Sequence, residues 1–429
     1  MEHELNAPFR AVQSCAAEIS PWKRQFLMVV HSPPRLVEDI FSLSLERAWD
    51  EASEQWFPIG EELHDLHCFL AGFVCKACSA LNNDAAGANV AIFNEESSTG
   101  STFRAVRLFL ERRKPRTFVL ENVRGLKRNQ QHEEVLRQLR ACHYCAVCLE
   151  MNPMRYGLPQ CRDRLYFVGI RLDLVEAAGW TDAGMQDWIT NLERCISSGH
   201  RKVDVDSFLL PESDSFVMAV KSQKLQQFLA RHEDSGAARA RRSQQKSMQK
   251  WVLKHRSVNR RVYRAACSVD NLEQFPHYAM LPDRIKDLLD CSGIAVPHNQ
   301  KLLMEVSQSS CSIGHGHCLT VTPKGFVWLA HRGRSLLGRE ALRLQGVHIP
   351  DLSMLEDLFS DTQLHDLAGN AFCIASCMPV QLVVCLALAN VSLPRQTRSA
   401  RARTIDGEVD WGRPLRSKRS RFGGSETGR

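Results

Sequence analysis

The chain has 429 residues, of which 44% are hydrophobic and 24% are charged, with a formal net charge of +7 and sixteen cysteines. This length suits one large α/β domain and a smaller one at roughly 100–200 residues per domain, and the globular composition excludes a disordered or fibrous protein without separating an enzyme from a binding module. The N-terminus lacks a secretion-signal pattern, so we expect a protein that is not secreted and whose cysteines are reduced.

The chain begins with alternating strand and helix patterns. We predict a strand over Arg10–Ala17, a helix over Pro21–Val30 and an extended segment over Leu36–Ile40. Glu18 and Asp39 stand at the ends of the two extended segments. We expect the strands to be parallel, so both acids are expected at carboxyl ends, where open α/β sheets bind ligands.

The alternation continues to Arg171, which predicts an α/β fold. The further elements, in chain order, are a strand His67–Gly72, a loop Phe73–Asn83, a helix Ser101–Arg113, a strand Thr117–Leu120 leading into Glu121-Asn122-Val123, a helix Gln131–Ala141, and strands His143–Met151 and Leu165–Arg171 separated by the connector Asn152–Arg164.

Two cysteine spacings resemble metal sites. Cys75 and Cys78 form a pair, and Cys142, Cys145 and Cys148 form a run. The pair lies in a loop of small apolar residues and the run lies in a predicted strand. Because neither has a convincing second pair of ligands, we expect no metal site.

The regular pattern stops after Arg171 and resumes near Cys318. Between them, Arg231–Arg264 holds eleven Lys and Arg against two acids, together with Trp251 and Tyr263. Such a block suits a surface that follows a phosphate backbone. A solvated helical face explains a lone basic block equally well.

The C-terminal part contains an extended segment Cys318–Thr322, a predicted helix Gly338–Gln345 and an apolar stretch Cys377–Val391. That stretch has about 15 residues, fewer than the ~20 that a membrane-spanning helix needs, so we expect a buried final helix and no membrane association. Arg395–Arg429 contains ten Lys and Arg against four acids and is expected to be a disordered basic tail. In a eukaryotic cell, Arg395–Arg421 would suit nuclear import.

Four short segments follow one another at predicted strand ends. They are Ala71-Gly72-Phe73-Val74-Cys75-Lys76-Ala77-Cys78-Ser79, Phe118-Val119-Leu120-Glu121-Asn122-Val123, Tyr156-Gly157-Leu158-Pro159-Gln160-Cys161-Arg162-Asp163-Arg164 and Ala368-Gly369-Asn370-Ala371. This ordered set resembles the DNA (cytosine-5) methyltransferase family over about Leu5–Arg171 and Cys318–Ala389. The resemblance implies a Rossmann-like, S-adenosylmethionine-dependent methyltransferase domain over residues 1–171 and 318–392, a smaller target-recognition domain over residues 172–317, and DNA as the partner.

The resemblance also implies roles for nine residues. Cys75 would be the nucleophile, Glu121 the acid that engages the target ring, and Gln160, Arg162 and Arg164 the group that braces the target base and its phosphate, with Asn122 beside them in substrate binding. Glu18 and Asp39 would hold the ribose and adenine of the cofactor, and Asn370 would lie next to it.

This chemistry explains the residue types. Carbon 5 of cytosine is a poor nucleophile, so a thiolate first adds at carbon 6 and turns the ring into an enamine-like species. An acid hydrogen-bonded at N3 stabilises the electron density that the addition places on the ring. Cations such as Arg162 and Arg164 would favour the thiolate of Cys75. Moving the base out of the duplex costs a few kcal/mol, which pocket and backbone contacts must recover.

The sequence departs from the family pattern in two places. No Gly-rich cofactor loop precedes Leu5–Val12, so we expect a chain that is either N-terminally truncated or degenerate. We expect it to bind the cofactor weakly or not at all until an upstream Gly-rich segment is added. Val74 and Lys76 flank Cys75 where the family has proline and a polar residue. Proline would fix φ and sharpen the loop.

These departures leave three hypotheses. The first is a DNA methyltransferase, and the second is a nucleic-acid-binding protein that keeps the fold and basic surfaces without turnover. The third is a transfer-RNA cytosine-5 methyltransferase, against which stands the absence of a Cys-Phe-Thr signature. The sequence sets neither the target site nor the oligomeric state.

Overall fold

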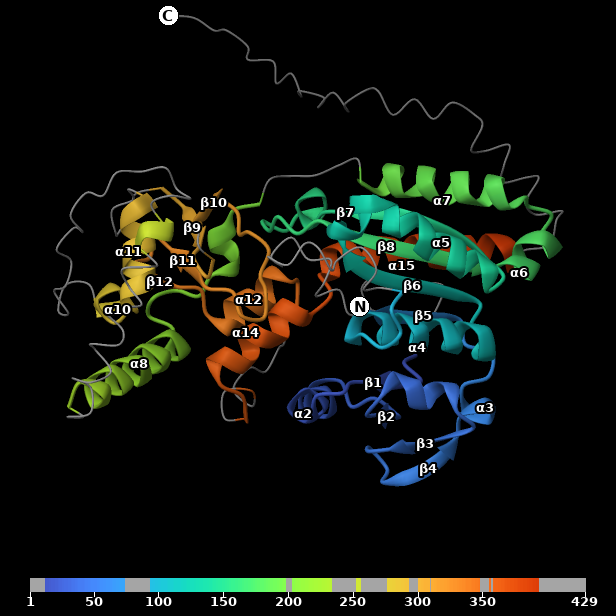
Figure 1. Ribbon diagram of the computed structural model, residues 1–429, viewed down its shortest axis with the longest axis horizontal. Coiled ribbons are helices and arrows are strands. Elements are labelled where there is room, and N and C mark those ends of the chain that lie inside the picture. Colours follow the sequence, from blue (N-terminus) through green and yellow to red (C-terminus); the bar gives the residue numbers. More distant parts are fainter. Residues whose placement is uncertain are drawn as a thin grey trace, which may run out of the picture.

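The computed structural model describes residues 12–73, 93–197, 203–233, 252–255, 276–292, 300–308, 310–347, 355 and 358–392. The described residues form two lobes, one built on the strands β5–β8 and the other on the strands β9–β12 (Figure 1). The start of the family resemblance at Leu5–Val12, most of the basic block Arg231–Arg264 and the tail 393–429 lie outside the described residues.

The main sheet carries the first lobe and has the order β5-β6-β8-β7. Its strands are β5 (Cys68–Gly72), β6 (Thr117–Val123), β7 (Tyr144–Met151) and β8 (Arg164–Arg171). β5 and β6 are parallel because a helix crosses over between them, whereas β8 runs antiparallel to both β6 and β7. The predicted α/β fold class is confirmed.

Helices cover both faces of the main sheet. On one face, α4 (Ser98–Arg113) and α5 (Gln131–Ala141) share an apolar core with β6. On the other face lie α6 (Leu172–Ala177), α7 (Asp182–Ser197) and α15 (Ile374–Ser392). The sequence analysis placed α6 and α7 in the second domain. Their apolar faces, which include Val175, Met185 and Ile189, instead pack on the main sheet with α15.

A small N-terminal unit packs below α4. It contains β1 (Ala16–Ala17), α2 (Pro21–Val30), β2 (Leu36–Val37), the 3-10 helix η1 (Ile40–Ser44), β3 (Arg47–Asp50), β4 (Gln55–Pro58) and α3 (Ile59–Glu62). β1 and β2 are parallel, as predicted, but each has only two residues, and the segment after β2 turns into η1 because Asp39 caps it. The helix predicted over Pro21–Val30 is confirmed.

The second lobe holds an antiparallel sheet with the order β10-β9-β11-β12. Its elements are α8 (Ser215–Glu233), α10 (Pro276–Ala279), α11 (Asp283–Ser292), β9 (Leu302–Glu305), β10 (Ser312–His315), β11 (Val327–Leu329), β12 (Arg334–Ser335), α12 (Gly338–Leu344) and α14 (Asp361–Asn370). The extended segment predicted over Cys318–Thr322 forms a single bridge between Cys318 and Gln160 instead of a strand.

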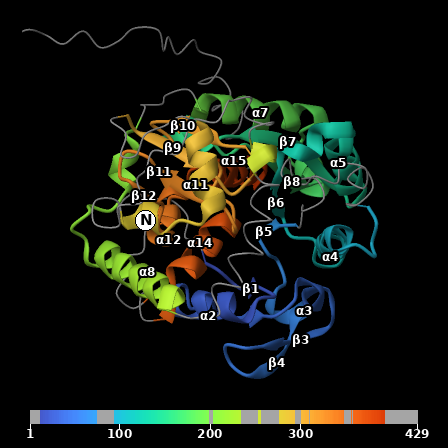
Figure 2. The same cartoon turned by 60° about the vertical axis from the view of Figure 1, so that its left-hand side comes forward.

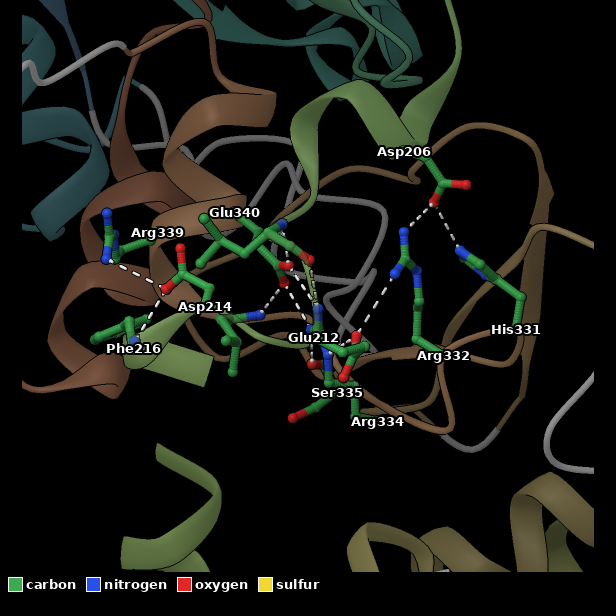
Figure 3. A network of polar contacts seen from close by, with 12 residues as sticks. Asp206, Glu212, Asp214, Phe216, His331, Arg332, Arg334, Ser335, Arg339 and Glu340 are labelled. Atoms are coloured by element: carbon green, nitrogen blue, oxygen red, sulfur yellow. Dashed lines mark hydrogen bonds and ion pairs between the residues drawn. The ribbon is translucent and has the colours of Figure 1, made fainter. Parts of the chain in front are cut away.

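Short 3-10 helices complete the connections, namely η4 (Arg124–Gln130), η5 (Pro153–Tyr156) and η6 (Val205–Phe208). The polar network of Figure 3 links the segment around η6 to β12 and α12 of the second lobe. At its centre, the buried Arg334 guanidinium pairs with the buried Glu340 carboxylate at 2.8 Å. Glu340 also accepts the backbone N–H of Leu210 at 2.8 Å, so the link is fixed to the start of α12.

By length and composition alone, the described stretch Asp361–Ser392 could cross a membrane. It is two helices, because α14 ends at Asn370 and α15 begins at Ile374. The face of α15 with Val380, Val383 and Ala387 is buried in the core of the main sheet, which explains the apolar composition. The prediction of a buried helix holds for this face only, since the opposite face leaves apolar side chains exposed, namely Met378, Leu382 and Leu386.

Candidate active site

Glu121 lies at the carboxyl end of β6, directly opposite Gly72 of β5 and Tyr166 of β8. Its Oε1 is 2.9 Å from Nε of Arg164, and the two side chains are only 15% and 14% exposed. Because this ion pair is largely screened from water, it holds the carboxylate in one orientation. The structure therefore brings together two of the predicted site residues.

Gly72 allows this end of the sheet to close. A Cβ on Gly72 would lie 3.3 Å from the ring of Phe372 and 3.8 Å from Oε2 of Glu121. Phe372 precedes α15, so the absence of a side chain on β5 lets the α14–α15 connection approach Glu121 closely.

Asn122 is buried and fixes the end of β5. Its Nδ2 donates to the carbonyl of Phe73 at 3.2 Å, and its Oδ1 accepts the N–H of Val123 at 2.7 Å. Phe73 is the last described residue before segment 74–92, and the predicted nucleophile Cys75 lies in that segment, outside the described residues. Asn122 thus anchors the backbone from which the segment with Cys75 departs.

Gln160 and Arg162 are buried, and their donors are used within the fold. Gln160 donates to the carbonyl of Leu344 at 3.1 Å. Arg162 donates to the carbonyl of Val321 at 2.8 Å and to that of Ala371 at 3.0 Å. These contacts join the connector before β8 to the second lobe and to the α14–α15 connection, so both side chains lie in the framework of the site.

Burial lowers the pKa of Arg162 to about 10, and the neighbouring charge of Arg164 adds to this effect. Arg162 is therefore still charged at neutral pH, and its buried charge is balanced by backbone carbonyl dipoles and by the nearby Glu121. Its Nε has no hydrogen-bond partner among the described residues.

Glu18 directly follows β1, and Asp39 follows β2 after one intervening residue, so both acids lie near the carboxyl ends of the paired strands, as the sequence predicted. Glu18 Oε1 accepts the N–H of Ser20 at 2.8 Å, and Asp39 Oδ1 accepts the N–H of Phe41 at 2.9 Å. The second oxygen of each carboxylate makes no hydrogen bond with any residue that the structure describes. Each acid thus shapes its own turn through one carboxylate oxygen.

Asn370 is exposed at the end of α14, where its Nδ2 donates to the carbonyl of Asp366 at 2.8 Å. Lys23 of α2 pairs with Asp366 at 2.9 Å, so α14 is tied to the helix that follows Glu18. The preceding Gly369 is required by close packing, because a Cβ there would lie 2.1 Å from the backbone nitrogen of Pro323.

Sequence reasoning missed Tyr166 and Phe372. Tyr166 is fully buried opposite Glu121, and its hydroxyl has no hydrogen-bond partner among the described residues. Burial is the main cause that raises the pKa of Tyr166 well above its ordinary value. The period of two along a strand could have revealed this residue, since Tyr166 follows Arg164 by two positions and so shares its face.

The cysteine run belongs to β7 and its approach. Cys142 and Cys148 pack with the core under α4 and α5, whereas Cys145 packs with the core under α7 and α15. The three thiols therefore lie on two faces of the main sheet.

A family model described as C-5 cytosine-specific DNA methylase matches residues 53–380. DNA (cytosine-5-)-methyltransferase DMT5 of Cryptococcus neoformans var. grubii is 25% identical over 393 residues, which cover 86% of this chain and 15% of that protein. Orphan methyltransferase M.SPBetaI of Bacillus phage SPbeta is 34% identical over 124 residues, or 28% of this chain and 25% of that protein. The chain spans less than half the length of these curated relatives.

Among solved structures, the S. pombe Dnmt2 methyltransferase is similar to this chain with a TM-score of 0.45 and 13% identity. The similarity covers 91% of this chain and 94% of that one.

Proposed function

Because the chain belongs to the C-5 cytosine-specific DNA methylase family, we propose that it transfers a methyl group from S-adenosylmethionine to carbon 5 of cytosine in DNA. The observation that carries the proposal is the ion pair of Glu121 with Arg164 at the end of β6. It lies beside Gly72, three residues before Cys75 in the sequence.

The residues around β1 and β2 fit a nucleoside. Glu18 and Asp39 each keep one carboxylate oxygen for the hydroxyl and amino donors of such a ligand, at neighbouring carboxyl ends of parallel strands. S-adenosylmethionine supplies the methyl group when bound. Glu18 and Asp39 would hold its ribose and adenine, with Asn370 beside it.

Cys75 acts as the nucleophile in this proposal. Its thiolate forms a bond to carbon 6 of cytosine, and the electron pair of the double bond between carbons 5 and 6 makes carbon 5 nucleophilic. Carbon 5 would use this pair to bond the methyl group, whose bond to the sulfur of the donor would break with its electron pair left on that sulfur. The proton of carbon 5 then goes to a base. The electron pair of that C–H bond restores the double bond, and the thiolate leaves carbon 6 with the pair of the C–S bond.

Glu121 engages the ring at N3 during the addition, and Arg164 positions its carboxylate. The ion pair keeps Oε1 on Arg164 and leaves Oε2 on the side of Gly72. Asn122 fixes the backbone at Phe73. Arg162 and Gln160 hold the surrounding connections together, and in this proposal they support the target base through the framework rather than by direct contact.

The covalent step is tested with DNA that carries 5-fluorocytosine. Fluorine at carbon 5 replaces the proton whose loss releases the enzyme, so the covalent adduct cannot break down. An adduct that survives denaturation is therefore expected when S-adenosylmethionine is present. Cys75→Ala is expected to abolish the adduct. The matched control is Cys68→Ala, which removes an exposed thiol of β5. An adduct that persists in Cys75→Ala contradicts the assignment of the nucleophile.

Transfer of a tritiated methyl group to DNA and to transfer RNA tests the acceptor in parallel. We expect label in DNA. Label in transfer RNA alone would show that transfer RNA, and not DNA, is the substrate. DNA binding without label in either acceptor, at saturating S-adenosylmethionine, would favour a binding protein without turnover.

A further inference from the structure

The strands β3 and β4 form a hairpin at the edge of the molecule, far from the second lobe in both views (Figures 1 and 2). We call residues Arg47–Pro58 the Trp hairpin. Ala48 and Phe57 point inward and are buried. Trp49 and Trp56 are paired across the two strands and point outward.

The two tryptophans form one aromatic surface. Their ring centroids are 5.9 Å apart with an interplanar angle of 68°, and the residues are 42% and 58% exposed. Single exposed apolar side chains are common, but two adjacent indoles are the largest apolar groups a chain can present, and a contiguous patch marks a binding surface.

The Trp hairpin is held rigidly. Asp50 is buried and accepts the N–H of Leu36 at 2.8 Å and the Nη1 of Arg35 at 3.0 Å. Arg35 in turn pairs with Glu62 at 2.8 Å. A partner that binds to a fixed surface does not have to order it first, so affinity is not lost in that step.

The charge around the Trp hairpin is opposite to that of the whole chain. Residues 36–62 contain eight acids and one base, Arg47, although the chain carries +7. Arg24 and Arg35 pair with three of these acids, Asp50, Glu51 and Glu62, and Arg112 and Arg113 donate to backbone carbonyls of residues 43–45. The acids therefore still outnumber the bases around the Trp hairpin, but by less than the sequence alone indicates. Glu46 and Glu54 are exposed and make no ion pair with any residue in the described part of the chain. Arg47 donates to the carbonyl of Trp56.

We propose that the Trp hairpin binds a Lys- and Arg-rich peptide segment of a partner protein. A cationic side chain would lie on the indole faces of Trp49 and Trp56, since tryptophan is the strongest aromatic partner for a cation. Glu46 and Glu54 would pair with further cations of the segment. The same acids repel DNA, which separates this surface from any that follows a phosphate backbone.

A cross-strand aromatic pair also stabilises its own hairpin. The two roles are separable, because hairpin stability needs apolar contact whereas cation binding needs the π-face. Leucine retains the apolar contact but has no π-face. Phenylalanine retains both the apolar contact and a π-face, which is weaker than that of tryptophan.

The test measures fluorescence anisotropy of a labelled peptide of alternating lysine and glycine titrated with the full chain. Trp49→Leu/Trp56→Leu is expected to weaken binding about tenfold, and Trp49→Phe/Trp56→Phe is expected to restore part of the loss. Glu46→Gln/Glu54→Gln is expected to weaken binding and flatten its salt dependence. Met218→Ala, which changes a residue 51% exposed on α8, is the control for loss of an exposed apolar group.

Binding that is equal in the wild type and in Trp49→Leu/Trp56→Leu, with thermal melts showing both folded, would overturn the proposal. The proposal would also be overturned if a peptide of alternating glutamate and glycine bound as tightly as the lysine–glycine peptide. A concentration-dependent dimer that is lost in the leucine variant, without any peptide binding, would assign the surface to a second copy instead. The measurement needs no methyl transfer, so its outcome is independent of the proposed function.

Discussion

Arg164 holds Glu121 through one short contact, so its replacement tests how much orientation contributes to the reaction. Arg164→Met is expected to lower kcat about 10- to 100-fold with a smaller change in KM, because misplacing a reacting group by a fraction of an ångström costs rate rather than ground-state binding. Arg164→Lys keeps the charge but loses the planar donor, so its kcat is expected to lie between those of the wild type and Arg164→Met. Methyl-transfer kinetics on DNA measure both. Arg155→Met, at an exposed position on η5, should leave kcat within about twofold, and an equal loss there would mean that general charge matters instead.

At this scale the sequence predicted two residues that the structure brings together, Glu121 and Arg164, but not how each site residue is used. Glu121 and Arg164 belong to β6 and β8, which are two strands apart along the chain but neighbours in the sheet, and their pairing follows from strand ends that a pattern can locate. The role of Arg162 does not follow, because its carbonyl partners Val321 and Ala371 are 159 and 209 positions away. A local motif carries no information about such partners, so burial of Arg162 was not predictable.

Long amphipathic helices were predicted well from the sequence, and short strands were not. The helices Pro21–Val30 and Gln131–Ala141 match the sequence prediction residue for residue, since ten or more positions define a face. β11 has three residues and β12 has two, which is too short for an alternation to appear. The antiparallel sheet of the second lobe therefore emerges only from long-range pairing with β9.

The start of α12 depends on one buried ion pair (Figure 3). Arg334→Met is expected to lower the free energy of unfolding by ~3–5 kcal/mol, because it leaves the carboxylate of Glu340 buried without its cation. The neighbouring Arg332 is 24% exposed and pairs with Asp206 at 3.2 Å, so Arg332→Met is expected to cost about 1 kcal/mol or less. Urea denaturation monitored by circular dichroism measures both. Equal costs for the two arginines would show that burial of the pair does not stabilise the lobe.

The stability of the whole molecule should fall in mild acid, because desolvation favours the neutral form of several histidines in the folded chain, although none of them is fully buried. Burial lowers the pKa of His31, His277 and His365. For His277 the value falls from 6.5 to about 4, and the charges of Lys221, Lys224 and Arg334 add to the effect of burial. The unfolded chain takes up these protons first, so the stabilisation is complete above pH 6.5 and is lost as the pH falls towards 4.

His277 should account for a measurable part of this loss. The drop in unfolding free energy between pH 7 and pH 5 is expected to be ~1 kcal/mol smaller in His277→Gln than in the wild type, after allowance for its partial exposure to solvent. Denaturant midpoints at the two pH values give the difference, and His315→Gln, at an exposed position, should leave the wild-type drop unchanged. The sign of the difference between the two stability drops is the decisive result. If His277→Gln lost more stability than the wild type on acidification, the histidine would have to gain a proton on folding, which the cationic surroundings supplied by Lys221, Lys224 and Arg334 oppose.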